Sequence, residues 1–261
     1  AMGCPDYDMT PQQMAKATSP HHVIQHEDIS SKLAMRGDDT RGNWHTIPAT
    51  RNEVANIAAI ARAHGAKVCT FTDAQATEEA FKALDGHAPD ALHFATHGFA
   101  ISTMQQYDNS PFAQSRTAFT PNGNYMMWSG LVLAGGNNAW QCKPLPKGVE
   151  DGILTADEIS RLDLSHTRLV VLSACETARG HIENTDGVWG LQRAFKQAGA
   201  GTIVMTLWKV SDETTCMFMT EFYRQLTNGL NTRQALKRAR TYLIEQGATD
   251  PYYWAAFVAI D

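Results

Sequence analysis

A continuous apolar run leads into small and polar residues at Leu169-Val170-Val171-Leu172-Ser173-Ala174-Cys175. Four aliphatic residues in succession, without alternation, are typical of a strand buried on both faces of a parallel sheet. Residues 91–95 form a second short apolar run, which leads into Thr96-His97-Gly98, and residues 202–207 form a third. Several buried strands of this kind predict a parallel sheet at the centre of the fold.

Amphipathic helical patterns lie between these apolar runs. Helices are expected at residues 51–64, 77–84, 188–197, 214–226 and 232–246, a short helix at 155–158, and further strands at 67–71, 130–133 and 254–260. Strands that alternate with helices imply an α/β domain, with a mostly parallel sheet flanked by helices on both faces. We place this domain at residues 48–261, after a partly irregular N-terminal arm at residues 1–47. Residues 101–152 read as a long loop apart from one strand.

Composition and charge narrow the classes of function. The chain has 261 residues, of which 43% are hydrophobic and 19% charged, as in ordinary globular domains. A net charge of -5 argues against direct nucleic-acid binding. The lack of an apolar run of about 18 residues argues against a membrane span. No secretory signal pattern is visible, and we interpret Ala1-Met2-Gly3 as a cloning remnant or a trimmed end.

Cysteine and histidine usage predicts neither a disulfide framework nor a metal site. The five cysteines are odd in number and widely spaced, so a reducing, cytoplasmic location is expected. His21-His22 with His26 lacks supporting carboxylate or cysteine spacing and reads as a solvated loop. We expect no cofactor.

His97 and Cys175 each follow a predicted strand. Reactive groups in open α/β sheets gather just beyond the carboxyl ends of the strands. A thiol becomes a useful nucleophile when a nearby imidazole takes its proton, so this pair has the chemistry of a cysteine hydrolase. The backbone N–H of Gly98, together with that of Cys175, is a candidate oxyanion hole. A single cysteine at a strand end is more often structural, and that alternative stays open at this point.

Two motifs add a resemblance to a known family. Thr96-His97-Gly98 and Leu172-Ser173-Ala174-Cys175-Glu176-Thr177 resemble the His-Gly and Ser-Ala-Cys-Glu-Thr motifs of CHAT domains, in the caspase, separase and gingipain group of cysteine peptidases. Further segments resemble the family in order along the chain, at residues 48–54, 130–135, 151–156, 187–195, 198–200, 207–212 and 254–258. The resemblance covers residues 48–260 and implies a caspase-like fold. It also implies that Cys175 is the nucleophile and His97 its base; no third triad member stands out.

Five further residues are candidates for substrate binding: Ser173, Glu176, Trp208, Asp212 and Cys216. Residues 208–212 resemble a stretch that lines the pocket for the residue before the cut in related peptidases. Two readings of this stretch stay open, because Trp208 equally suits the core and Asp212 equally suits a helix cap. Ser173 and Cys216 stand where metacaspases and separases carry acids, so we predict a neutral, apolar residue before the cut. Glu176 either contacts His97 or substrate, or binds nearby backbone amides.

The resemblance implies an endopeptidase that cuts one or a few protein substrates inside the cell. CHAT domains are typically effectors, which suggests a regulated role in prokaryotic defence or programmed cell death, such as activation of a pore-forming partner. No repeat modules are visible, so a sensor or activator protein is expected to be a separate partner or a missing segment. Two alternatives remain: a catalytically silent CHAT-fold interaction module, and a thiol transferase that uses the same dyad.

Overall fold

The computed structural model describes residues 1–18, 43–100, 126, 129–141, 143–173 and 186–261. Its centre is a six-stranded sheet in the order β2-β1-β3-β7-β8-β9. These strands are β1 (Met2–Pro5), β2 (Phe71–Asp73), β3 (Ala91–Ala95), β7 (Leu169–Leu172), β8 (Thr202–Thr206) and β9 (Phe257–Ile260). All neighbours pair in parallel except β9, which runs antiparallel to β8. The predicted mostly parallel α/β sheet is confirmed.

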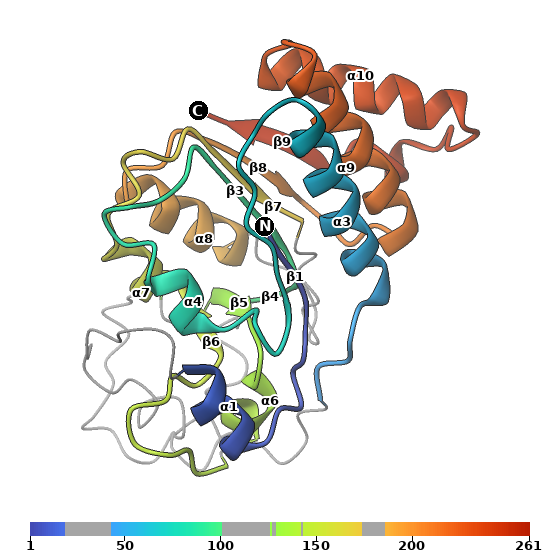
Figure 1. The fold of residues 1–261 in the computed structure, drawn as a ribbon. Coiled ribbons are helices and arrows are strands. Elements are labelled where there is room, and N and C mark those ends of the chain that lie inside the picture. The colour runs from blue at the N-terminus through green and yellow to red at the C-terminus, as the bar shows by residue number, and fades with distance from the viewer. Residues whose placement is uncertain (19–42, 101–125, 127–128, 142, 174–185) are drawn as a thin grey trace.

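Helices cover both faces of this sheet (Figure 1). One face carries α3 (Pro48–Ala63), α9 (Asp212–Thr227) and α10 (Thr232–Glu245), and the other carries α4 (Glu78–Lys82), α7 (Ala156–Ser160) and α8 (Asp186–Gln197). Successive residues of β7 point to opposite faces: Val170 packs in the cluster with α4, α7 and α8, and Val171 in the cluster with α9 and α10. Both are fully buried, and each such burial stabilises the fold by about 1.5–3 kcal/mol.

A second, smaller sheet lies beyond the end of β3. It is antiparallel, in the order β4-β5-β6, with β4 at His97–Ala100, β5 at Ser129–Val132 and β6 at Ile153–Thr155. Only Thr96 separates β3 from β4. The chain therefore passes directly from the central sheet into the strand that begins with His97.

Side-chain caps fix where three helices begin. Thr77 accepts a hydrogen bond from the Ala80 N–H at the start of α4, and Thr155 forms a capping box with Glu158 at the start of α7. At α9 the cap is Ser211, whose side chain accepts from the Thr214 N–H. The reading of Asp212 as the cap is therefore wrong, and its carboxylate is left exposed in the first turn of the helix.

The segment 1–47, which the sequence predicts to be a partly irregular arm, contains two regular elements among its described residues. Met2–Pro5 form β1, which lies between β2 and β3 in the central sheet, and α1 (Pro11–Thr18) follows. Met2 and Gly3 pair with Phe71 and Thr72 on one side and with β3 on the other, so they form part of the central sheet. Four residues are too short a run to show a strand periodicity in sequence.

Smaller differences concern the bounds of the predicted strands and loops. β2 begins at Phe71, where the predicted strand ends, because Phe71 pairs with Met2 at the start of β1. The predicted loop at 101–152 contains α6 (Gly136–Trp140) and, at its end, leads into β6. A short 3-10 helix, η4 (Pro251–Tyr253), stands before β9, which is shorter than predicted.

In the described part of the chain, every helix falls short of the length and apolarity that a membrane crossing requires.

Candidate active site

The strand register brings the ends of the two strands that precede the sequence motifs to one edge of the sheet. β3 pairs with β7 so that Phe94 lies opposite Leu172. His97 is the third residue after Phe94, just as Cys175 is the third after Leu172. Cys175 and Glu176 lie outside the described residues, so the site is built here from the residues around His97.

The His97 side chain is held by a backbone carbonyl. Its Nε2 lies 2.7 Å from the carbonyl oxygen of His45. Since a carbonyl only accepts, Nε2 carries the proton, and in the neutral ring Nδ1 is the unprotonated nitrogen. The backbone N–H of His97 donates to the hydroxyl of Tyr7, at 3.4 Å.

Two aromatic side chains pack against the imidazole. The ring centroids of Trp44 and Tyr7 lie 5.0 Å and 5.3 Å from that of His97. This burial lowers the pKa of His97 below its ordinary value of 6.5; the His45 carbonyl and the Asp212 carboxylate oppose the shift, and Lys209 adds to it. The site therefore favours a neutral imidazole.

Tyr7 is itself fixed by the strand that carries His97. Its hydroxyl donates to Thr96 Oγ1 at 2.9 Å, and the Thr96 hydroxyl donates in turn to the carbonyl of Val132 in β5. Burial raises the pKa of Tyr7 well above its ordinary value, so it stays a neutral phenol. These hydrogen bonds fix Thr96, the residue before His97, between Tyr7 and β5.

The predicted substrate-binding residues lie in different surroundings. Ser173 is buried, and its Oγ meets no hydrogen-bond partner in the described part of the chain. Cys216 lies on α9 with its sulfur against Asn56 of α3, and burial raises the pKa of its thiol. Trp208 is half-buried and donates its indole N–H to the carbonyl of Tyr252 at 2.9 Å.

Among the described members of this set, Asp212 is the one whose charge acts on His97, and Trp208 packs against Tyr252. Trp208 follows the carboxyl end of β8 and is stacked on Tyr252, so it combines core packing with a partly open face. The exposed Asp212 carboxylate acts electrostatically on both His97 and Tyr7. Gly98, the predicted oxyanion donor, is buried in β4 opposite Leu131.

Comparison with known proteins decides the family. The CHAT domain family matches residues 5–261, almost the whole chain. The chain belongs to the CHAT domain family. This family is related to caspase-like cysteine peptidases, as the sequence resemblance predicts.

Two relatives of this CHAT domain are much longer proteins. Human (Homo sapiens) Tetratricopeptide repeat protein 28 is 31% identical over 180 residues, which is 66% of this chain and 7% of that protein. The mouse (Mus musculus) protein of the same name is 26% identical over 257 residues, 96% of this chain and 10% of that protein. The CHAT domain thus spans about a tenth or less of these relatives.

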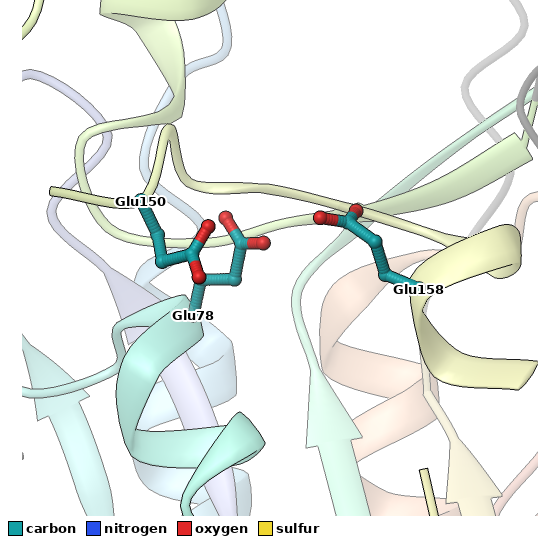
Figure 2. A group of neighbouring side chains, drawn as sticks. All are labelled: Glu78, Glu150 and Glu158. Atoms are coloured by element: carbon teal, nitrogen blue, oxygen red, sulfur yellow. The ribbon is translucent and has the colours of Figure 1, made fainter. Parts of the chain in front are cut away.

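A cluster of carboxylates in this CHAT domain resembles a metal site at first sight (Figure 2). Glu78, Glu150 and Glu158 each offer an oxygen within 4.8 Å of the others. However, Lys82 Nζ lies 2.7 Å, 3.0 Å and 2.9 Å from these three carboxylates. The ammonium group supplies the cation, so the cluster reads as an ion-pair network that ties α4 to α7 and to the chain before β6.

The sequence interpretation missed the residues that surround His97. Tyr7, Trp44 and His45 all lie in the segment expected to be an arm, and they reach His97 from 52 to 90 residues away in the chain. His45 acts through its carbonyl, which every residue type has, so no sequence signal marks it. The available signal was the presence of Tyr7 and Trp44, since large aromatic side chains are mostly buried and are unusual in an irregular arm.

Proposed function

We propose that this CHAT domain is a cysteine endopeptidase that hydrolyses peptide bonds in specific protein partners through Cys175 and His97. One observation carries the proposal: the Nε2–H of His97 is bound to the His45 carbonyl, which leaves Nδ1 as the basic nitrogen. The register of β3 and β7 supports it, since both residues follow paired strands at the same distance. A base with a fixed tautomer beside a thiol is the arrangement that nucleophilic catalysis requires.

In the proposed reaction, Nδ1 takes the proton of the Cys175 thiol and the thiolate attacks the scissile carbonyl. The carbonyl oxygen becomes an oxyanion, which the backbone N–H groups of Cys175 and Gly98 are proposed to stabilise. The imidazolium then gives its proton to the leaving amine, and the C–N bond breaks. Nδ1 then takes a proton from a water molecule that attacks the thioester carbonyl; the C–S bond breaks, the acid product leaves, and the imidazolium gives this proton to the Cys175 thiolate.

The His45 carbonyl replaces the acidic member of a triad. It accepts from Nε2–H, orients the ring, and favours the imidazolium that forms during the reaction. The Asp212 carboxylate has the same electrostatic effect from a greater distance than a hydrogen bond. A dyad supported by a carbonyl is therefore sufficient for the proposed chemistry.

We further propose that Ser173, Glu176, Trp208, Asp212 and Cys216 contribute to substrate binding. The residue before the cut is proposed to be neutral and apolar, because Ser173 is a buried hydroxyl and the Cys216 thiol is kept neutral by burial. Cleavage of a peptide library only after arginine or lysine would contradict this part of the proposal.

The proposed cellular role is that of a regulated effector with a protein substrate and a sensor or activator partner. A defence or cell-death role, such as activation of a pore-forming partner, follows from the family resemblance alone. Tandem repeats named in the longer relatives suggest that a repeat segment is one source of control. A cytoplasmic location remains part of the same proposal.

Labelling by an electrophilic peptide probe tests the activity. The probe should modify Cys175, found by mass spectrometry of tryptic peptides, and Cys175→Ala should abolish both labelling and cleavage of a proteome-derived peptide library. Cys69→Ala is the matched control, because Cys69 is an exposed free thiol away from the site and its loss should change neither. A wild-type protein that neither labels at Cys175 nor cleaves the library supports the silent interaction module instead. Transfer of the acyl group to an added amine, in preference to water, supports the thiol transferase.

A further inference from the structure

We propose that Asn137 is a positioning residue of this site: its side chain holds the Trp44 peptide so that the next carbonyl, that of His45, meets His97 Nε2. The inference rests on the proposed cysteine peptidase chemistry for its catalytic consequence. We call the two hydrogen bonds between the Asn137 side chain and the Trp44 backbone the clamp. Its effect on His97 can be tested without any activity.

The Asn137 side chain bonds to both backbone groups of one residue. The Trp44 N–H donates to Asn137 Oδ1 at 2.8 Å, and Asn137 Nδ2 donates to the Trp44 carbonyl at 3.0 Å. The second amide hydrogen goes to Asp8 Oδ1 at 2.7 Å. The amide thus pairs with Trp44 as a neighbouring strand would, and the donors and acceptors allow only one orientation of the amide group.

Burial makes this arrangement costly to disturb. Asn137 is 2% exposed and Trp44 is 7% exposed. Buried backbone groups need hydrogen-bond partners, and the Asn137 amide supplies them for the Trp44 peptide. The segment that carries the His45 carbonyl therefore has its position set from α6.

Helix α6 also fixes the other aromatic wall of the site. The Asn137 backbone N–H donates to the carbonyl of Tyr7 at 3.1 Å, and Trp140 packs its ring 5.0 Å from that of Trp44. The helix starts after Gly135, whose φ of +82° suits glycine, and a Cβ there would lie 2.4 Å from Met14. One residue, Asn137, thus joins the two chain segments that enclose His97.

The catalytic consequence follows from the atoms that are joined. Asn137 sets the Trp44 peptide, the following peptide presents the His45 oxygen, and this oxygen holds Nε2–H and the plane of the ring. Loss of the clamp should let the ring turn, so that Nδ1 no longer faces one direction. Substrate binding does not depend on this alignment, so the turnover number should fall while KM stays near its original value.

Matched asparagine variants provide the test. Asn137→Ala removes the clamp, and Asn137→Asp keeps its shape and the acceptor for the Trp44 N–H but loses both donors. Asn138→Ala is the control: Asn138 is the next residue of α6, is similarly buried at 5% exposed, and bonds to the Met9 and Gly135 carbonyls instead.

The direct readout is the imidazole Nε2–H of His97 in protein labelled with ¹⁵N-histidine, assigned by its loss in His97→Gln. We expect a slowly exchanging Nε2–H signal in the wild type and in Asn138→Ala, and its loss in Asn137→Ala and Asn137→Asp. The turnover number should fall about 10- to 100-fold in both Asn137 variants and by less than about 2-fold in Asn138→Ala. If Asn137→Ala does not fold, Asn137→Asp carries the test.

Two results would overturn the clamp: an Nε2–H signal that persists in folded Asn137 variants, or one that disappears equally in Asn138→Ala. Absence of peptidase activity in the wild type is a different outcome. It would remove the proposed function, while the Nε2–H signal would still decide whether Asn137 positions His97.

Discussion

His93 and His97 lie four residues apart on consecutive strands, and their ring nitrogens are used in different ways. His93 in β3 is 3% exposed; its Nε2 lies 2.8 Å from Glu53 Oε1, and its Nδ1 lies 3.2 Å from the Tyr223 hydroxyl. His97 has Nε2 bound to a carbonyl, and no residue of the described ranges bonds to its Nδ1. A ring with both nitrogens bonded to buried groups is a structural element, whereas one with a single free nitrogen can exchange a proton with a reactant.

Lys82, like His93, has its polar group engaged by other residues of the protein. Its ammonium group is surrounded by three carboxylates and is 9% exposed, and these charges raise its pKa even though burial alone would lower it. Its charge is compensated inside the protein, which is the environment of a structural lysine; a catalytic lysine has to present its amine to a reactant.

The largest expected effect is on turnover. His97→Ala should lower kcat/KM for a cleaved library peptide by at least about 1000-fold, since the thiol loses its base. The variant should remain folded by circular dichroism and thermal unfolding. Retention of more than a tenth of the wild-type rate would remove the distinction between the two histidines.

The largest expected effect on stability is at Lys82. Lys82→Met leaves three neighbouring carboxylates without their cation and should lower the free energy of unfolding by about 3–5 kcal/mol, measured by urea denaturation. Lys237→Met on the exposed face of α10 is the control and should change it by less than about 0.5 kcal/mol. Equal losses in the two variants would show that the network adds no stability.

His93→Phe should behave as a structural substitution. It removes the hydrogen-bond partner that the buried Glu53 carboxylate has in the described part of the chain, so the free energy of unfolding should fall by about 2–4 kcal/mol. The turnover number of the folded protein should stay within about 2-fold of the wild type. A tenfold fall in turnover with normal stability would place His93 in the catalytic machinery.

Tyr223→Phe removes only the hydroxyl that meets His93 Nδ1. The expected loss is about 1–2 kcal/mol, because one buried acceptor is left unsatisfied. Urea denaturation of single and double variants with His93→Phe checks this, since the two losses should be less than additive. Full additivity would mean that the two side chains act independently.

The smallest expected effect is the pH dependence that His97 adds to stability. In the Cys175→Ala background, burial keeps the folded-state pKa of His97 below 6.5, so the unfolded chain binds more protons as the pH falls. His97 should therefore add no pH dependence to stability well above pH 6.5, and its contribution to stability should fall as the pH drops below that value. Urea denaturation of Cys175→Ala and of Cys175→Ala/His97→Gln across this range gives the difference, which should have this sign; the opposite sign would mean that the folded state favours the imidazolium.

Much of the fold could be predicted because its signals are local. The apolar run at β7 and the caps at Thr77 and Thr155 depend on neighbouring residues, and the structure contains all three. β1 could not be predicted, because it depends on pairing with β2 and β3, which lie far along the chain. The enclosure of His97 could not be predicted either, because Tyr7 and His45 contact it from 90 and 52 residues away. The motif containing His97 predicts the base, but the tautomer of His97 depends on a backbone carbonyl that leaves no mark in the sequence.

The central claim is that Nδ1 of His97 faces Cys175. The most direct test is the titration of the His97 ring by ¹⁵N NMR in the wild type and in Cys175→Ala, with His93 as an internal reference. We predict a higher His97 pKa in the wild type, where a thiolate stabilises the imidazolium, a value below 6.5 in Cys175→Ala, and unchanged His93 signals. Identical His97 titrations in the two proteins would contradict it.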